Sequence, residues 1–519
     1  MPVESAHPLA TIEPRLRTLL PAMLYASAWV EPTPPLLLQV FDHLRTLRRM
    51  LQDYVPRFVA EAPPMPGVTR YDWQEGTLMF TDLAGFTTLV EANAAAGPAG
   101  AEALLQVLNG YFAEMVEIIS KSGGNLLEWT GDAMLVQFRA EKQRSAAAQA
   151  VRAGLRMQRA MRRFASIATA AGTIALGMRI GLHTGRFIAA DIGTPQRMEY
   201  VLLGDAVQTT KYAESVGTVG RVCLSPATHA AVAGEFRFEP TDSGYCLVLD
   251  DLETAQLGEY DLALSKRRQA GGVLLDRSVA GIVREVEEAL AFVEQLASYL
   301  PAPVLNLLVE NAAQRKIAAQ FLQIPVLFVN LIGITEAAGR IQPAEELLLL
   351  SGYSRLFALI NAAVDTQGGV LKNVTYDRSG SNMLIYFGVA NAHTNDADRA
   401  AHTALAILQI VTQSPPLLFE DMAVTVGCKI GMAFGPAFAA EIGEPRGRRE
   451  FNLLGDAVNT AARLMGAAAS NQILLDGAMR QAVGARFNCT DLGSVALKGK
   501  TAPTPLYALQ PPEITPGRS

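Results

Sequence analysis

The chain has 519 residues, half of them hydrophobic, which is enough apolar sequence for several buried cores. Its 44 basic and 50 acidic residues give a net charge of −6, so no basic surface predicts nucleic-acid binding. Four cysteines lie far apart and form no CxxC pair, which argues against a disulfide framework or a zinc cluster.

The sequence shows neither a signal peptide nor a clear membrane span. The N-terminus lacks the charged-then-apolar pattern of a secretory signal. The longest apolar stretch, residues 321–334, is interrupted by Gln323, Pro325 and Asn330, and falls short of the roughly 20 apolar residues that a bilayer requires. We therefore expect a soluble, cytoplasmic chain without a transmembrane segment.

Residues 1–70 are predicted to form a helical segment that packs against the rest of the chain. Apolar side chains recur there at helical spacing, at Leu16, Leu19, Leu20, Met23 and Leu24. The segment ends in LQDYVPRFVAE, which resembles LASYLPAPVLN at residues 296–306, because each is a helix followed by Tyr-x-Pro. The second of these belongs to a connector at 266–319, with an amphipathic helix expected over 283–299.

The chain contains a duplicated domain. Four segments recur in the same order at a nearly constant offset: FTDLAGFT (80–87) as FVNLIGIT (328–335), GDAMLVQF (131–138) as GSNMLIYF (380–387), RIGLHTG (179–185) as KIGMAFG (429–435), and YVLLGDAVQTT (200–210) as FNLLGDAVNTA (451–461). This pattern indicates two copies of about 190 residues rather than a solenoid. We place copy one at 71–265, copy two at 320–510 and a tail at 511–519.

Each copy is predicted to be an α+β domain. In copy one, TLMFTD favours a strand, GGNLLEWTGDAMLVQF a hairpin, SAAAQAVRAGLRMQRAMRRF a helix and IALGMRIGLHTG another strand. Antiparallel strands with helices on one face give the ferredoxin-like βαββαβ arrangement. The predicted fold is therefore two ferredoxin-like domains preceded by a short helical segment.

Two aspartates of copy one are candidate metal ligands. Asp82 ends the first predicted strand, and Asp132 lies at the tip of the hairpin. If the two strands are neighbours, both carboxylates meet at one edge of the sheet, where they can hold Mg²⁺ and share it with phosphate. Two such ions would activate a hydroxyl and neutralise a leaving phosphate. The alternative, that both residues only cap turns, stays open on spacing alone.

The two copies divide the polar residues between them. Copy two has Asn330 and Ser381 where copy one has Asp82 and Asp132. Conversely, copy two carries an Asn and an Arg in its DAVNTAAR segment where copy one carries other residues; the pairs are Asn459 against Gln208 and Arg463 against Tyr212. Such sorting is expected of a site built across the interface between the copies.

These motifs together resemble the class III nucleotidyl cyclases, in the tandem form of soluble adenylyl cyclases with two unlike catalytic domains. The resemblance covers about 71–265 and 320–510. It implies that Asp82 and Asp132 bind two Mg²⁺ or Mn²⁺ ions, and that Asn459 and Arg463 stabilise the transition state. Charge builds on the phosphoryl oxygens as the 3′-hydroxyl attacks the α-phosphorus, and preorganised donors stabilise it.

The resemblance also implies residues that select the base. A polar residue three before the glycine of the later motif is Asn452 here, and a lysine of the hairpin corresponds to Lys372, although this hairpin is longer than that of copy one. A lysine donor and a neutral amide suit adenine. Because the acidic Asp377 is nearby, a guanine-selective pocket remains an alternative. A second alternative is that Lys372 is a solvated lysine at the end of a strand.

Three cations are expected at the nucleotide phosphates. Arg179 matches an arginine of the family that faces the phosphates, and Lys498 and Lys500 match its late Lys-Gly-Lys. Copy one has no lysine at the equivalent LGEYDL segment. The alternative is that these lysines are surface cations beside a glycine turn.

A second, degenerate cleft is expected between the copies. Six residues are predicted to line it: Glu128, Val201, Gln208, Lys211, Asn330 and Ser381. In bicarbonate-stimulated relatives this cleft holds the anion between a lysine and an arginine, which match Glu128 and Lys211 here. A carboxylate would repel the anion and could pair with the lysine, so we expect weak or absent stimulation. The cleft could also simply be packed shut.

The sequence thus predicts an adenylate cyclase that converts ATP to 3′,5′-cyclic AMP and diphosphate. One chain would supply both halves of the site and act as a monomer. A guanylate cyclase and an inactive nucleotide-binding signalling module are the alternatives. Because no GxxxxGK[ST] motif is present, the chain is expected to be a short family member or a fragment.

Overall fold

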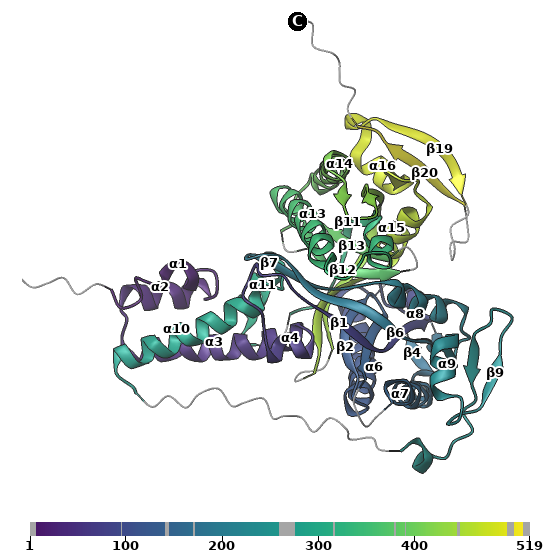
Figure 1. The fold of residues 1–519 in the computed structure, drawn as a ribbon. Coiled ribbons are helices and arrows are strands. Elements are labelled where there is room, and N and C mark those ends of the chain that lie inside the picture. Colours follow the sequence, from purple (N-terminus) through teal and green to yellow (C-terminus); the bar gives the residue numbers. More distant parts are fainter. Residues whose placement is uncertain are drawn as a thin grey trace, which may run out of the picture.

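The computed structural model describes residues 7–94, 96–140, 145–169, 172–258, 276–314, 317–377, 380–389, 391–443, 447–495 and 503–511. Two sheet-and-helix domains lie against each other, and a helical arm projects from their junction (Figure 1). We call them domain 1, domain 2 and the arm.

Domain 1 is built around an eight-stranded sheet. Its strands are β1 (Arg70–Ala84), β2 (Asn125–Thr130), β3 (Ala133–Arg139), β6 (Gly177–Thr194), β7 (Arg197–Leu203), β8 (Val222–Leu224), β9 (Phe238–Pro240) and β10 (Cys246–Val248), and a small hairpin consists of β4 (Ile167–Thr169) and β5 (Gly172–Ile174). Its helices are α5 (Phe86–Ala94), α6 (Gly97–Lys121), α7 (Ala146–Ala160), α8 (Asp205–Val216) and α9 (Pro226–Val232), with 3₁₀ turns η1 (Met161–Phe164) and η2 (Thr254–Leu257).

Domain 2 repeats this plan. Its strands are β11 (Gln320–Ile332), β12 (Val370–Asp377), β13 (Gly380–Tyr386), β16 (Gly427–Gly443), β17 (Arg449–Leu454), β18 (Gln472–Asp476), β19 (Cys489–Val495) and β20 (Thr504–Leu509), with a small hairpin of β14 (Leu417–Leu418) and β15 (Ala423–Val424). Its helices are α12 (Ile334–Ala338), α13 (Glu346–Thr366), α14 (Asp396–Gln413), α15 (Asp456–Ala467) and α16 (Gly477–Val483), with the 3₁₀ turn η3 (Gly484–Arg486).

The two sheets have the same strand order. Domain 1 reads β2-β3-β1-β6-β8-β10-β9 with β7 paired to β6, and domain 2 reads β12-β13-β11-β16-β18-β20-β19 with β17 paired to β16. The first four strands of each order run antiparallel, as in a ferredoxin-like unit. The predicted α+β class is therefore confirmed, and the repeated motifs occupy equivalent strands of the two sheets.

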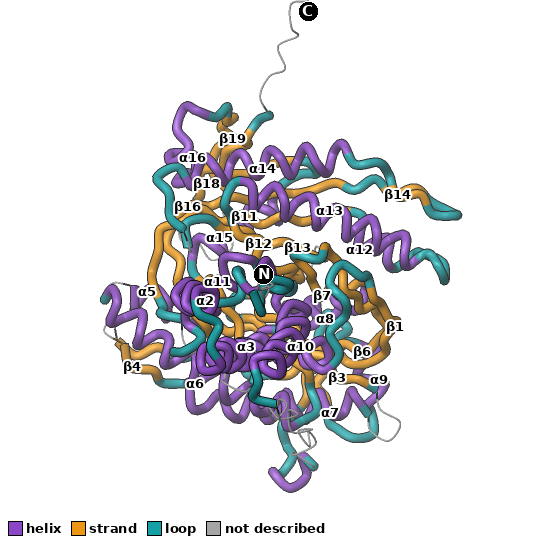
Figure 2. The backbone as a smooth tube through the Cα atoms, turned by 90° about the vertical axis from the view of Figure 1, so that its left-hand side faces the viewer, coloured by secondary structure: helices purple, strands orange, loops and turns teal. Residues whose placement is uncertain are grey.

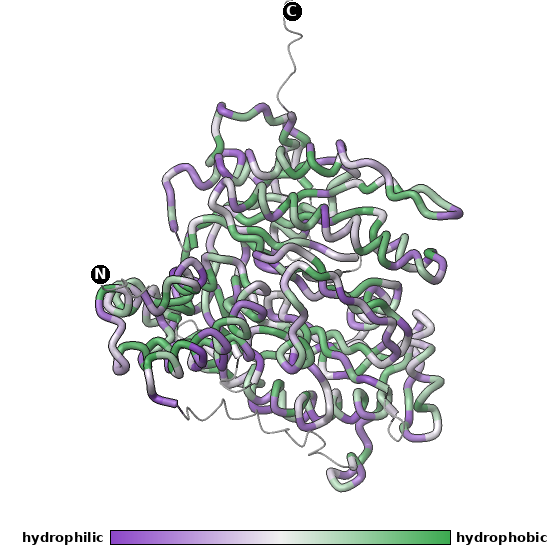
Figure 3. Tube along the Cα trace, turned by 60° about the vertical axis from the view of Figure 1, so that its left-hand side comes forward, coloured by the Kyte–Doolittle hydropathy of each residue, from purple (hydrophilic) through white to green (hydrophobic). Residues whose placement is uncertain are grey.

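The arm consists of α1 (Glu13–Leu16), α2 (Ala22–Val30), α3 (Pro34–Tyr54) and α4 (Arg57–Glu61), together with α10 (Val279–Ala297) and α11 (Ala302–Asn311) of the connector. Helices α3 and α10 lie side by side (Figures 1 and 2). Apolar and polar residues alternate along them (Figure 3), and their apolar faces share one core with part of domain 2. Leu16, Leu19 and Leu20 are buried in this core as expected, whereas Met23 is 80% exposed, contrary to the prediction.

Each Tyr-x-Pro segment crosses to the domain that does not follow it in the chain. Tyr54, which precedes domain 1, donates a hydrogen bond to Glu441 of domain 2 at 2.7 Å. Tyr299, which precedes domain 2, donates to Asp191 of domain 1 at 2.6 Å. Burial raises the pKa of both phenols, so they act as donors across the neutral range. The arm is thereby fastened to both domains.

One described helix, α13, is long and apolar enough to cross a membrane by length and composition. In this structure it packs against α14 and β12 of its own domain and against β6 of domain 1. Leu349, Tyr353 and Phe357 on its inner face are fully buried in the protein core. A core helix of a globular domain can have the same length and composition, so α13 is weak evidence for a membrane span.

Candidate active site

The two aspartates of copy one lie together at the edge of the domain 1 sheet. Strand β1 pairs with β3 in a register that sets Thr81 opposite Met134, so Asp82 follows the last paired residue of β1 and Asp132 directly precedes β3. Strand β1 itself continues to Ala84 along β6, two residues beyond the predicted end at Asp82. Burial and the neighbouring carboxylate of Asp82 raise the pKa of Asp132 to about 8, while its own backbone N–H and Lys211 lower it. The β1–β3 pairing thus holds two like charges close together.

A chain of charged side chains runs from this acidic pair into domain 1. Arg179, the register partner of Asp82 on β6, donates a hydrogen bond to the Asp82 carboxylate. Its Nε lies 3.1 Å from Glu214 of α8, and the second oxygen of Glu214 lies 2.8 Å from the Nζ of Lys211. We expected Lys211 to face Glu128 in the second cleft. The structure places it beside the acidic pair instead, because Glu214 holds it there and the ring of Phe80 lies under its Nζ at 4.4 Å.

The acidic pair has the donor chemistry of a divalent-cation site. Carboxylate oxygens are the ligands that Mg²⁺ and Mn²⁺ prefer, and a bound cation would relieve the repulsion that raises the pKa of Asp132. In the described part of the chain, no group of three or more His, Cys, Asp or Glu residues forms a metal cage. A cation at Asp82 and Asp132 would therefore complete its shell with water and phosphate oxygens.

Domain 2 brings Asn452 to the same edge of the domain 1 sheet. Asn452 on β17 donates a hydrogen bond to the Gly131 carbonyl at 2.9 Å, next to Asp132, and α15 begins four residues later. Asn459 and Arg463 lie on this helix and are half-buried. In the ranges that the structure describes, neither side chain forms a hydrogen bond or an ion pair. Both are therefore available to a ligand.

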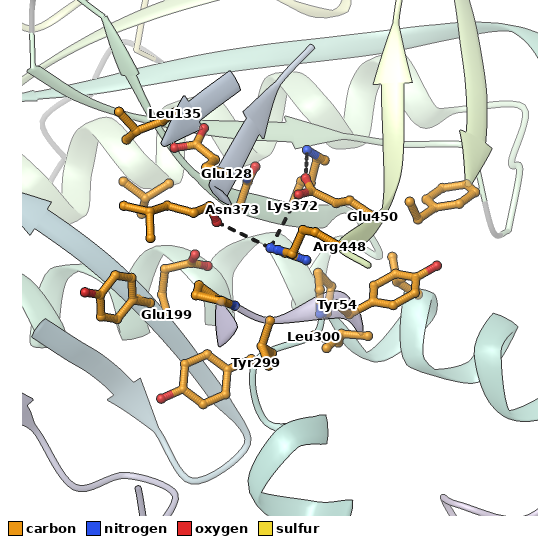
Figure 4. A pocket seen from close by; sticks show the side chains of 18 of the residues that line it. Tyr54, Glu128, Leu135, Glu199, Tyr299, Leu300, Lys372, Asn373, Arg448 and Glu450 are labelled. Atoms are coloured by element: carbon orange, nitrogen blue, oxygen red, sulfur yellow. Dashed lines mark hydrogen bonds and ion pairs between the residues drawn. The ribbon is translucent and has the colours of Figure 1, made fainter. Parts of the chain in front are cut away.

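Lys372 lies deep between the domains and is 5% exposed, so the solvated-lysine alternative is wrong. Its ammonium forms an ion pair with Glu450 and donates to the Trp129 carbonyl at 3.4 Å (Figure 4). It lines a pocket of about 70 Å³ that also receives Glu128 and Glu199 from domain 1. The carbonyls that Lys372 and Asn452 contact are two residues apart in the same hairpin.

Sequence reasoning named Glu128 but missed two other acids of this pocket, Glu199 and Glu450. Glu450 holds Lys372, and its counterpart Glu199 is ion-paired with Arg197 at 2.7 Å. Burial raises the pKa of Glu199 to about 7, although Arg197 lowers it. The sequence contained a signal for these two acids, because RMEYVLLGDAV and RREFNLLGDAV both have Arg-x-Glu ahead of the shared LLGDAV motif.

At the second cleft, Asn330 and Ser381 stand at the positions of the two aspartates. The side-chain amide of Asn330 donates to the Ser381 carbonyl at 3.2 Å, and both residues are buried. A side chain added at Gly380 would come within 3.5 Å of Gln208, which places α8 against the hairpin tip of domain 2. Val201 is fully buried on β7. Glu128 lines the pocket described above.

Three predicted or alternative residues cannot be placed. Lys498 and Lys500 lie outside the described residues, as does the side chain of Asp377. The structure therefore leaves the late lysines and the guanine-type pocket as predictions.

Comparisons with known proteins agree with this geometry. The sequence matches the family described as "Adenylate and Guanylate cyclase catalytic domain" over residues 68–249 and 317–510. Adenylate cyclase type 10 of Rattus norvegicus is 22% identical over 462 residues, which cover 86% of this chain and 27% of that protein. An adenylate cyclase of Mycobacterium tuberculosis is 29% identical over 232 residues, covering 44% of this chain and 48% of that protein.

Among solved structures, a class III adenylyl cyclase-like ATP-binding protein from Pseudomonas aeruginosa superposes with a TM-score of 0.54 at 13% identity. The match covers 86% of this chain and 92% of that one, so the tandem fold is shared. The chain spans about a quarter of the length of the type 10 relative. With two matched segments that together cover most of its length, the chain belongs to the family of adenylate and guanylate cyclase catalytic domains, in tandem form.

Proposed function

We propose that the chain is an adenylate cyclase that converts ATP to 3′,5′-cyclic AMP and diphosphate at one site between its domains. One observation carries this proposal: the acidic pair of domain 1 lies at the hairpin tip that domain 2 contacts just ahead of α15, whose Asn459 and Arg463 have no hydrogen bond or ion pair among the described residues. The names of the adenylate cyclase relatives support the choice of product.

The division of labour follows from these positions. Asp82 and Asp132 would hold two Mg²⁺ or Mn²⁺ ions, which supply charge neutralisation and an activated 3′-hydroxyl when bound. The 3′-oxygen would lose its proton to solvent and form a bond to the α-phosphorus as the bond to the bridging oxygen breaks and diphosphate leaves. Arg463 and Asn459 donate hydrogen bonds to the oxygens on which charge builds. Arg179 adds a cation beside Asp82 that is suited to the released diphosphate.

Adenine rather than guanine is proposed because the described polar groups near the base position are a lysine and a neutral amide, Lys372 and Asn452. Both side chains are engaged with domain 1 carbonyls or with Glu450 in this conformation. A nucleotide base that accepts a hydrogen bond from the Lys372 ammonium must therefore compete with Glu450 for that group.

A catalytically inactive ATP-binding module is the second candidate. It is favoured by the description of the Pseudomonas aeruginosa protein, a cyclase-like ATP-binding protein that shares the tandem fold. The complete set of metal, amide and guanidinium groups argues for turnover, because an inactive module needs no unpaired Arg463. We further propose a cytoplasmic monomer, since both halves of the site come from one chain.

Product analysis tests the proposal. The full chain is incubated with ATP or GTP in Mg²⁺ or Mn²⁺, and cyclic nucleotides are separated by chromatography, with Asp82→Ala in parallel. Cyclic AMP from the wild type and none from the variant supports the adenylate cyclase. Cyclic GMP would keep the mechanism and overturn the base assignment. No product from a folded chain that binds ATP would favour the inactive module.

A further inference from the structure

The strand that carries Lys372 is interrupted by a bulge. The pairing of β12 with β13 shifts its register between Leu371 and Val374. Lys372 and Asn373 therefore oppose a single residue of β13, which is the arrangement of a β-bulge. Neighbouring residues of a regular strand point to opposite faces, whereas these two both line the pocket between the domains (Figure 4). The bulge thus determines where the Lys372 side chain leaves the strand.

An arginine of domain 1 holds this bulge. Strand β12 is an edge strand of the domain 2 sheet and contacts β2 and β7 of domain 1. The carbonyl of Lys372 accepts a hydrogen bond from Nη2 of Arg197, the first residue of β7, at 2.9 Å. Both residues are buried, and Arg197 is 4% exposed. Because a buried carbonyl requires a donor, the arginine stabilises the bulged backbone at Lys372.

Arg197 is itself fixed by contacts to two other segments. Its Nη1 donates to the Tyr299 carbonyl of the connector at 3.0 Å, and its Nη2 donates to Glu199 of β7 at 2.7 Å. A guanidinium presents its donors in a rigid planar fork, which the single ammonium of a lysine cannot reproduce. One side chain therefore holds the connector, β7 and the bulge of the other domain in a fixed relation.

We propose that Arg197 is a positioning residue for base selection, which holds the β12 bulge from the opposite domain and thereby sets the position of the Lys372 ammonium. The inference rests on the proposed contact of Lys372 with adenine. It makes domain 1 a determinant of base selectivity, although Lys372 and Asn452, the two proposed base contacts, both belong to domain 2.

The equivalent bulge of domain 1 provides an internal comparison. The pairing of β2 with β3 shifts its register around Leu127, whose carbonyl accepts a hydrogen bond from Arg448 of domain 2 at 3.4 Å. Arg448 and Arg197 begin the two equivalent Arg-x-Glu segments. The arginine contact therefore belongs to the duplicated scaffold. The bulged residue is an apolar leucine in domain 1, whereas in domain 2 it is the lysine that we assign to the base.

Nucleotide binding tests the inference without relying on turnover. The full chain is titrated by calorimetry, in Mn²⁺, with the α,β-methylene analogues of ATP and GTP, which cannot release diphosphate. Arg197→Met removes the donor, and Arg197→Lys keeps a positive charge beside Glu199 without the planar fork. Lys372→Met is the reference. Trp73→Phe is the matched control, because it removes another hydrogen bond between the domains, from Trp73 to Glu346 at 2.6 Å.

The two Arg197 variants are expected to weaken binding of the ATP analogue about 10-fold, the size of one hydrogen bond to a charged group, and to affect the GTP analogue less. The preference for the ATP analogue should therefore fall toward that of Lys372→Met. If Arg197 acts through Lys372, the double variant Arg197→Met/Lys372→Met should show the same preference as Lys372→Met alone. Trp73→Phe should keep the wild-type preference. Either Arg197 variant suffices if circular dichroism shows that the other is unfolded.

An unchanged preference in a folded Arg197 variant, together with a shift in Lys372→Met, would overturn the inference and leave the adenine site standing. An equal shift in Trp73→Phe, or a further shift in the double variant, would also overturn it, because the effect would not pass through Lys372. An unchanged preference in Lys372→Met would remove the proposed base assignment and this inference with it. The expected preferences without any cyclic nucleotide product would support the inference and remove the proposed activity.

Discussion

The two clefts between the domains share one geometry and differ in charge. In the first, Asp82 and Asp132 lie against a domain that carries Asn459 and Arg463. In the second, the side-chain amide of Asn330 donates to the Ser381 carbonyl, which is a contact within domain 2. Duplication kept the scaffold of both clefts, and substitution left the acidic pair in one of them.

The difference shows that two neighbouring carboxylates are kept only in the cleft that holds the candidate site. Burial and the neighbouring carboxylate of Asp82 raise the pKa of Asp132 and cost stability, a cost that recurs at functional sites. An Asn and a Ser at the equivalent positions avoid that cost. The pocket around Lys372 also brings charges of the two domains together: the Lys372–Glu450 ion pair of domain 2 lines it along with two acids of domain 1, Glu128 and Glu199.

The largest effect is expected from removing one carboxylate of the first cleft. Asp132→Asn should abolish cyclic nucleotide formation, because a single carboxylate cannot hold the cations in place. Ser381→Ala in the second cleft should leave turnover unchanged, since the Ser381 group that Asn330 contacts is a backbone carbonyl. Product formation under saturating Mn²⁺ measures both. Equal losses would show that the clefts are not functionally distinct.

The next largest effect is expected at α15. Arg463→Ala should lower kcat about 100- to 1,000-fold with a smaller change in KM, because its guanidinium would act on charge that develops during the reaction. Gln208→Ala, on the equivalent helix of domain 1, serves as the control and should leave kcat unaffected. A change confined to KM would assign Arg463 to ground-state binding.

Breaking the buried ion pair should destabilise the chain. Lys372→Met leaves the buried Glu450 with its longer ion pair to Arg448, at 3.7 Å, so the loss of unfolding free energy should reach at most about 3–5 kcal/mol. The double variant Lys372→Met/Glu450→Met should recover much of this loss. Urea unfolding monitored by circular dichroism gives the comparison. A double variant less stable than either single variant would contradict the pairing.

A smaller, pH-dependent effect is expected at Glu199. Its pKa is raised to about 7 by burial and by Glu450, while Arg197 and Lys372 lower it. Because the folded-state pKa exceeds that of the unfolded chain, its stabilising contribution is complete below about pH 4.5 and is lost as pH rises through about 7. Between pH 5 and 8 the melting temperature of the wild type should therefore fall relative to Glu199→Gln. Parallel curves would show that Glu199 does not titrate there.

The smallest effect is expected from bicarbonate. The carboxylate of Glu128 repels an anion, and Lys211 is held by Glu214, so bicarbonate added at constant pH should leave turnover nearly unchanged. Cyclic AMP formation with chloride at equal ionic strength is the control. A several-fold rise would contradict the contrast drawn between the clefts.

Much of the fold follows from the sequence alone. The four recurring motifs predict two equivalent α+β domains. Segments with the same pattern of apolar residues form the same strands and helices and bury the same faces. The acidic residues Asp82 and Asp132 could be selected because they lie beside the paired strands β1 and β3, and the exchange of Asn459 and Arg463 between copies predicts their partner residues.

Only the tertiary structure decided which side chains meet across the domains. The hydrogen bond of Asn452 to Gly131, the place of Lys211 beside Glu214 and the burial of Lys372 against Glu450 depend on how the two sheets are packed together. Periodicity and motif spacing describe each segment by itself, and they carry no information on contacts between residues more than 70 positions apart, such as Lys372 and Glu450. The sequence determined the domains and the candidate ligands, and packing determined their partners.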